Sequence, residues 1–128
     1  MDSETKLVKL IAYLIELTQK GKLNWRRYEP PDPIVTSHDN KIDFVYVTNF
    51  ENKKLRIYEE RYKYWYDEGR YTWDNQVVID FADDEGRSIW RFPKLPGAWD
   101  LLEAVRYQEA EVDDFISELI NKHKLGEK

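Results

Sequence analysis

The chain has 128 residues, of which 41% are hydrophobic, 15% aromatic and 35% charged, and it contains no cysteine. This length suits one core, so we expect a single globular domain over residues 1–128. The lack of cysteine excludes disulfides, a thiolate nucleophile and a thiolate zinc site, and the apolar runs are too short to span a bilayer. These features favour a soluble, cytoplasmic protein.

The formal net charge of −5 is unevenly distributed. Residues 1–73 carry 13 Lys/Arg and 12 Asp/Glu, whereas residues 74–128 carry 7 Lys/Arg and 13 Asp/Glu. Nucleic acids and anionic membranes are bound by clustered Lys and Arg, so the acidic second half predicts neither as a partner.

The apolar spacing of the N-terminal segment predicts a helix over residues 4–20, with Ser3 as its N-cap and Gly21 at its C-terminal end. Three prolines in residues 29–33 then exclude helix and interior strand.

Four strands are predicted next, over residues 41–48, 55–66, 76–82 and 88–92. The segments between them, residues 52–54, 67–70 and 83–86, are rich in turn-forming residues, and Gly86 suits a left-handed position. Short connections of this kind favour an antiparallel meander.

The C-terminal part is predicted to be helical from residues 96–98 onward. Its second half places an apolar stripe on one helical face, formed by Val112, Phe115, Ile116, Leu119 and Ile120. The stripe is out of phase with the apolar residues before Gln108, so we expect a break between Gln108 and Glu111. The predicted fold is therefore α+β and two-layered, with a four-stranded antiparallel meander, an N-terminal helix and a broken C-terminal helical segment.

The long strand over residues 55–66 changes its apolar face near Glu59. Its odd positions begin with Leu55 and Ile57 and continue with charged residues, whereas tyrosines occupy most even positions. One interpretation places a bulge at residues 59–61, which turns Tyr62, Tyr64 and Tyr66 toward the core. The other keeps the strand regular and leaves the tyrosines facing solvent. We favour the bulge, because unpaired buried charges are costly.

The aromatic residues are the most informative feature for function. They either cover the sheet and stabilise cross-strand pairs or form a contact surface, because Tyr, Trp and Arg dominate interface energies. The candidate binding residues are Arg56, Tyr58, Tyr62, Tyr64, Tyr66 and Trp73. The leading hypothesis is a non-enzymatic protein-interaction domain that binds another protein or a second copy of itself. A stacking platform for single-stranded nucleic acid is disfavoured by the weak local charge.

No constellation predicts an enzyme, a metal site or a cofactor. Ser37, His38 and Asp39 are adjacent in a polar loop, and neighbouring extended residues do not form a triad, so we interpret them as a surface turn. His123 is interpreted as a cation at a helix end. Glu59 and Glu60 are expected on opposite strand faces, which excludes them as a catalytic pair.

The acidic second half supports a different hypothesis, an inhibitor or immunity-type protein that blocks a basic partner by charge. Its acidic residues concentrate in residues 80–85 and 109–114. The first of these stretches lacks the ligand spacing of a calcium loop, so we interpret it as a charged hairpin tip.

Residues 17–25 read Leu-Thr-Gln-Lys-Gly-Lys-Leu-Asn-Trp, and the C-terminal helix begins with Val-Asp-Asp-Phe-Ile at residues 112–116. With the order of elements between them, these segments resemble small, uncharacterised bacterial α+β proteins. The resemblance implies the fold class and no activity. Within it, we expect Trp25 to pack into the core where the helix meets the sheet.

Overall fold

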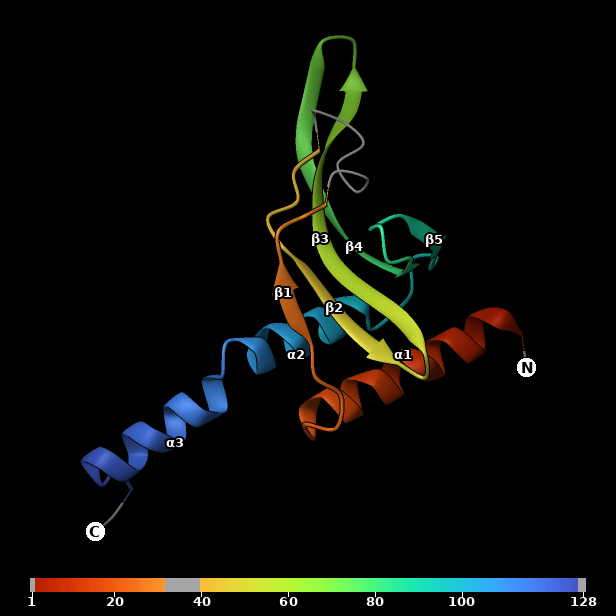
Figure 1. The fold of residues 1–128 in the computed structure, drawn as a ribbon. Coiled ribbons are helices and arrows are strands. Elements are labelled where there is room, and N and C mark those ends of the chain that lie inside the picture. Colours follow the sequence, from red (N-terminus) through yellow and green to blue (C-terminus); the bar gives the residue numbers. More distant parts are fainter. Residues whose placement is uncertain (1, 32–39, 127–128) are drawn as a thin grey trace.

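The computed structural model describes residues 2–31 and 40–126 (Figure 1). The elements are α1 (Ser3–Gln19), β1 (Arg26–Tyr28), β2 (Val45–Phe50), β3 (Lys53–Asp67), β4 (Arg70–Ala82), β5 (Ser88–Arg91), α2 (Ala98–Glu109) and α3 (Val112–His123). The strands form one open antiparallel sheet in chain order, β1 to β5. The predicted α+β class is confirmed, with five strands in place of four.

One strand was missed from the sequence, and the wrong N-cap residue was assigned to the first helix. The short strand β1 was missed because Arg26, Arg27 and Tyr28 are all exposed and show no alternation. The N-cap of α1 is Asp2 in place of Ser3, and its carboxylate accepts a hydrogen bond from the backbone N–H of Thr5 at 2.8 Å.

The predicted helix boundaries near Gly21 and Glu111 are confirmed. Gly21 has φ +71°, and the chain reverses there with the N–H of Lys22 bonded to the carbonyl of Leu17 at 2.9 Å. Glu111 has φ +54°, which interrupts the helical path between α2 and α3.

The main core lies between the sheet and the helices α1 and α2. Its buried side chains come from both helices, three strands (β2, β3 and β4) and the connecting segments, and they include Ile11, Leu14, Tyr46, Leu55, Ile57, Ile79, Leu101, Leu102 and Val105. Burial of each large aliphatic side chain stabilises the fold by about 1.5–3 kcal/mol. The helices α1 and α2 therefore pack against the halves of β3 and β4 that lie away from the turn between these two strands.

Trp25 lies in this core and is 4% exposed, as the sequence predicted. Its indole N–H donates to the Thr18 hydroxyl at 3.0 Å, and its backbone N–H donates to Oε1 of Gln108 at 2.9 Å. The Gln108 amide also donates to the carbonyls of Thr18 and Leu23, at 3.0 and 2.7 Å. Gln108 thus ties the ends of α1 and α2 together.

The opposite sheet face carries a smaller apolar cluster of Val45, Tyr58 and Val78. Beside it, the guanidinium of Arg56 donates to both carboxylate oxygens of Asp80, at 2.8 and 2.6 Å, and to the carbonyl of Gly86 at 2.8 Å. Arg56 and Asp80 are 2% and 1% exposed. The pair is fully satisfied, which is the condition for tolerating buried charge.

The predicted bulge at residues 59–61 is wrong. The pairing of β3 with β4 runs without interruption from Lys54–Ala82 to Trp65–Tyr71, and the register shifts only between Trp65 and Asp67, next to the turn. The bulge was inferred to keep charged odd positions out of the core. It is unnecessary because the two strands extend past the helices, so Arg61 is exposed on a regular strand.

None of the helices in residues 2–31 and 40–126 is long and apolar enough to cross a membrane.

Candidate functional site in the hairpin of β3 and β4

The outer half of the β3–β4 pair projects from the body as a two-stranded ribbon (Figure 1). Among the described residues, the outermost backbone pairing of β3 with any segment other than β4 joins Arg61 to Lys41. On the other side, β5 pairs with β4 only from Asp80 onward. We call residues 62–74 the distal hairpin. Two-stranded ribbons have two faces and two edges to present to a partner.

One face of the distal hairpin carries three aromatic rings in contact with one another. Trp65 and Tyr71 are paired across the strands with ring centroids 4.9 Å apart, and Trp73 meets Tyr71 edge-on at 6.1 Å. The ammonium groups of Lys63 and Lys41 lie 4.5 Å from the Tyr71 ring and 4.8 Å from the Trp73 ring. We call these five residues the aromatic–lysine face, and each of its rings remains 40–55% exposed.

The opposite face carries tyrosines and a carboxylate. Tyr64 is 56% exposed, whereas the Tyr62 hydroxyl donates to Asp74 across the ribbon at 3.3 Å. Partial desolvation and the nearby Asp74 charge raise the pKa of Tyr62, so the phenol stays neutral and donates. Asp74 also accepts the backbone N–H of Asn75 at 2.8 Å. This contact occupies a backbone donor of β4 and makes strand addition at that point less favourable.

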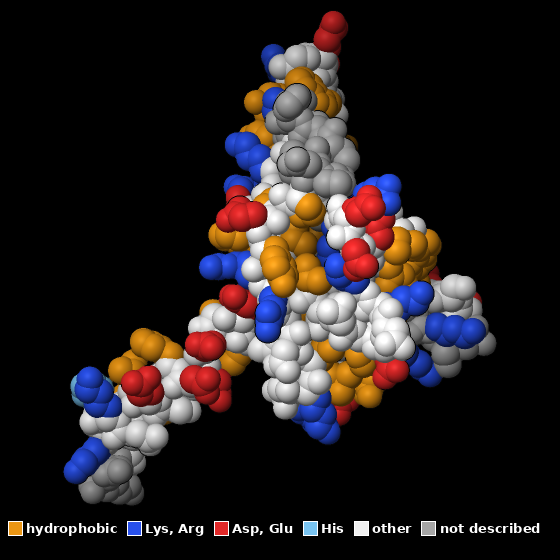
Figure 2. All heavy atoms as spheres, in the orientation of Figure 1, with side chains coloured by type: hydrophobic (Ala, Val, Ile, Leu, Met, Phe, Trp, Pro, Cys, Tyr) orange, Lys and Arg blue, Asp and Glu red, His pale blue; other side chains and the backbone are white. Residues whose placement is uncertain are grey.

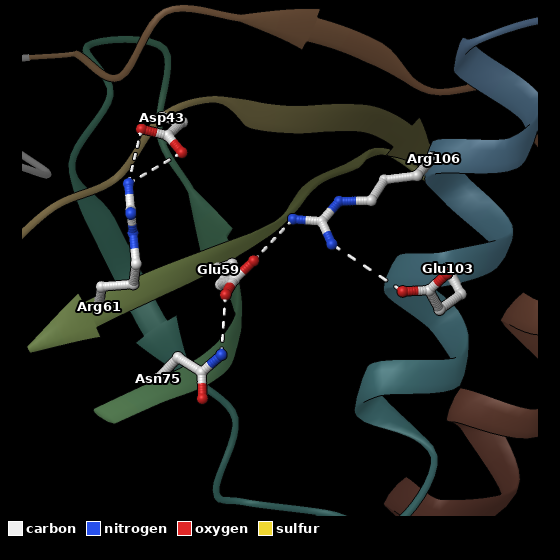
Figure 3. Close-up of polar contacts among 6 residues, drawn as sticks. All are labelled: Asp43, Glu59, Arg61, Asn75, Glu103 and Arg106. Carbon is white, nitrogen blue, oxygen red and sulfur yellow. Dashed lines mark hydrogen bonds and ion pairs between the residues drawn. The ribbon is translucent and has the colours of Figure 1, made fainter. Parts of the chain in front are cut away.

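The base of the distal hairpin is anchored to α2 by a carboxylate (Figure 3). Glu59 accepts hydrogen bonds from Arg106 of α2 and from the side-chain amide of Asn75, both at 2.9 Å. These two bonds hold the pKa of Glu59 below its ordinary value of 4.5.

A second ion pair lies beside it: Arg61 binds both oxygens of Asp43 at 3.0 Å. Like the Glu59 contacts, it lies at the base of the ribbon (Figure 3).

The structure divides the six candidate binding residues into three groups. Arg56 and Tyr58 are 2% and 6% exposed, so they are removed from the candidate surface. Burial and the neighbouring Asp80 charge raise the pKa of Tyr58 to about 12, as expected for a core phenol. Tyr62, Tyr64 and Tyr66 belong to the outer ribbon. Trp73 lies on the other face of this ribbon from Tyr62 and Tyr64.

Sequence reasoning missed four members of the aromatic–lysine face: Lys41, Lys63, Trp65 and Tyr71. The alternation along the strand did indicate that Lys63 and Trp65 share a face, because both occupy odd positions, as Leu55 and Ile57 do. It was overlooked because β4 was predicted to start at residue 76, whereas it starts at Arg70. Without residues 70–75 in the strand, Trp65 had no cross-strand partner.

The other charged residues considered in the sequence analysis make contacts within the protein. Asp80 is buried with Arg56, and the other carboxylates of residues 80–85 form ion pairs at the surface: Asp83 and Glu85 with Arg87, at 2.9 and 3.0 Å, and Asp84 with Lys54, at 3.2 Å. Glu60 lies on the sheet face opposite Glu59 and accepts from the Gln76 amide at 2.8 Å.

His123 lies in the last turn of α3, and Ser37, His38 and Asp39 lie outside the described residues. Within residues 2–31 and 40–126, no group of three or more His, Asp or Glu side chains is placed to hold a metal ion.

No protein-family profile, curated protein or solved structure matches the chain.

Proposed function

We propose that the chain is a non-enzymatic protein-binding domain whose contact surface is the aromatic–lysine face of the distal hairpin. The supporting observation is the cluster of Trp65, Tyr71 and Trp73, which are 55%, 40% and 45% exposed on a ribbon that the helices do not cover. Trp and Tyr rings bury large areas at low conformational cost and dominate interface energies. In Figure 2, hydrophobic and basic side chains share this projecting region.

The chemistry of the face favours a protein segment with apolar and acidic side chains. Lys63 and Lys41 already lie against the rings, so their charges border the apolar surface. Carboxylates of a partner would meet the ammonium group of Lys41 while its apolar side chains cover the rings. Because β3 and β4 pair without interruption as far as Trp65 and Tyr71, little ordering of the ribbon is required on binding.

A photo-crosslinking amino acid tests this surface in the cells that produce the protein. We expect benzoylphenylalanine at Tyr71 to form an adduct with a defined protein. The matched control is the same residue at Tyr13, which is 50% exposed on α1 and far from the hairpin in sequence. Excess unlabelled protein should suppress the adduct, whereas excess Trp73→Ser protein should suppress it much less.

Two results would contradict the proposal. One is that probes at Tyr13 and Tyr71 form the same protein adduct to the same extent, which would show that crosslinking does not depend on the distal hairpin. The other is adduct formation that Trp73→Ser protein suppresses as well as the wild-type protein. A probe at Tyr64, on the opposite face, shows whether the contact uses one face or both.

The acidic-inhibitor hypothesis retains one supporting observation. Five carboxylates line a broad groove of about 1220 Å³ between α1, α2 and the start of α3, namely Asp100, Glu103, Glu111, Asp113 and Asp114. A basic partner bound there would dissociate as salt rises. The variant Glu111→Gln/Asp113→Asn/Asp114→Asn would weaken such binding at low ionic strength and leave crosslinking at Tyr71 unchanged.

A further inference from the structure

The C-terminal helix α3 leaves its apolar stripe uncovered. None of residues 112–123 is fully buried, and Phe115, Ile116 and Ile120 are 61%, 43% and 42% exposed. Figure 1 shows α3 extending away from the sheet and from α1. The stripe has the spacing of one helical face, which is the pattern of a helix that packs against another surface.

A helix of this kind requires a partner for its stability. Isolated helices shorter than about 12–15 residues are marginal in water, because nucleation is costly and tertiary packing supplies most helical stability. Helix α3 spans Val112–His123, which is about 18 Å at 1.5 Å per residue. A surface that covers the stripe would supply the missing stabilisation.

The charges of α3 are separated along its length. Asp113 and Asp114 lie in the first turn, and Lys122 and His123 lie in the last turn, with Lys124 directly after it. Figure 2 shows acidic side chains near the end that joins the body and basic side chains toward the free end. Two such helices placed antiparallel bring the acidic end of each beside the basic end of the other.

From this self-complementarity we infer that the apolar face of α3 binds α3 of a second copy of the chain, forming an antiparallel, two-fold symmetric helix pair. With the axis at the middle of the helix, Ile116 of one copy meets Leu119 of the other at the centre of the interface, and Phe115 and Ile120 flank this contact. The same register places the acidic first turn of each helix at the level of the basic last turn of the other. A parallel pair would juxtapose like charges at both ends, which disfavours it.

The body of the molecule extends the acidic side of this interface. The groove at the start of α3 contains Asp113 and Asp114 together with Glu111 and Asp100. Each second-copy helix would therefore direct Lys122 and Lys124 toward a region that already carries net negative charge. The pair is small, so we expect a reversible dimer.

Sedimentation velocity over a range of concentrations tests the dimer with the full chain. We expect the wild-type chain to show a monomer–dimer equilibrium. The variant Phe115→Gln/Ile116→Gln, which keeps good helix formers, should raise the dimer dissociation constant at least about tenfold, because each loss occurs twice in a two-fold interface. The matched control Ile89→Gln removes a residue that is 66% exposed on β5 and should leave the constant unchanged.

A charge-swap pair tests the antiparallel orientation. At low salt, Lys122→Glu/Lys124→Glu and Glu111→Lys/Asp113→Lys should each weaken self-association about tenfold, and an equimolar mixture should form a heterodimer near wild-type strength. Far-UV circular dichroism checks that α3 remains helical in both variants. A strict monomer at all concentrations would overturn the inference. Self-association that persists in the Phe115→Gln/Ile116→Gln variant but is lost in Trp73→Ser would also overturn it, by assigning the contact to the distal hairpin.

Discussion

The two halves of the β3–β4 pair obey the same alternation but lie in different environments. In the inner half, Leu55 and Ile57 on one face and Arg56 and Tyr58 on the other are all buried. In the outer half, Trp65, Tyr64 and Tyr66 are more than half exposed, although the pairing to β4 continues through Trp65. On the face of Leu55 and Ile57, the difference arises because α1 and α2 cover only the inner half, and on the other face because Val45, Val78 and the Asp80 carboxylate surround only Arg56 and Tyr58.

This contrast separates two properties that alternation alone does not distinguish. Alternation determines which residues share a sheet face, since successive side chains point to opposite sides. Whether that face is buried depends on the length of the covering layer, which is set by other segments of the chain. The outer ribbon is therefore expected to contribute surface for binding, and the inner half is expected to contribute stability.

The largest expected effect comes from the buried ion pair of the inner half. Asp80→Ala leaves the Arg56 guanidinium buried without its carboxylate, so we expect the free energy of unfolding to fall by about 3–5 kcal/mol. Urea denaturation measures this loss. Asp74→Ala in the outer ribbon is the matched control, and it should lower stability by less than about 1 kcal/mol because it removes only exposed contacts. Equal losses in the two variants would contradict the division between the halves.

The next effect compares apolar residues of the same strand. Ile57 is completely buried, so Ile57→Ala should lower the free energy of unfolding by about 3 kcal/mol through lost transfer energy and a residual cavity. Tyr64→Ala, in the exposed ribbon, should change it by less than about 0.5 kcal/mol. Thermal denaturation of the two variants provides the measurement. A large loss for Tyr64→Ala would show that the outer ribbon belongs to the core.

Much of the fold could be predicted from sequence, and the reasons differ between elements. The stripe of α1, the Gly21 stop and the break before Glu111 depend on local spacing and backbone preference, so they were predicted closely. The strand β1 was missed because its three residues are exposed and show no alternation. The first half of β4 was missed although Tyr71 and Trp73 alternate with polar residues, because its pairing with β3 depends on register.

The candidate site was predicted in part. Of the six candidate residues, only Trp73 belongs to the aromatic–lysine face; Tyr62, Tyr64 and Tyr66 lie elsewhere on the outer ribbon, and Arg56 and Tyr58 are buried. The burial of Arg56 could not be read from the strand alone, because its partner Asp80 lies on the neighbouring strand and depends on register. Arg56 then appeared to be an exposed basic residue.

A smaller effect concerns the junction between the two halves, and it depends on pH. The folded-state pKa of Glu59 lies below its ordinary value of 4.5, chiefly because Arg106 and Asn75 donate to the ionised form. The carboxylate therefore contributes stability above about pH 4.5, and this contribution is lost as pH falls through the lower, folded-state pKa. Because Arg106 is 38% exposed, solvent screening limits the contribution to about 1 kcal/mol or less.

The test at this junction is the difference in unfolding free energy between the wild-type chain and Glu59→Gln. We expect the wild-type chain to be more stable at pH 7 and the difference to shrink below pH 4.5. Glu103→Gln is the matched control, since its carboxylate is 71% exposed and 4.0 Å from Arg106, and it should show no measurable difference. A difference that is independent of pH would show that packing, not charge, is responsible.

The smallest effect on stability is expected from the largest deletion. Replacing residues 63–73 with Asn-Gly closes the ribbon directly after the Tyr62–Asp74 pair with a favourable two-residue turn. The deleted side chains are exposed or half-exposed, and a shorter loop lowers the entropic cost of closure, so the free energy of unfolding should change by less than about 1 kcal/mol. Denaturation and near-UV circular dichroism measure this. In the crosslinking experiment, an excess of this variant should not suppress the adduct that the probe at Tyr71 of the full-length chain forms. A loss of several kcal/mol would place the outer ribbon within the folding core, and binding and stability could then no longer be assigned to separate halves of the hairpin.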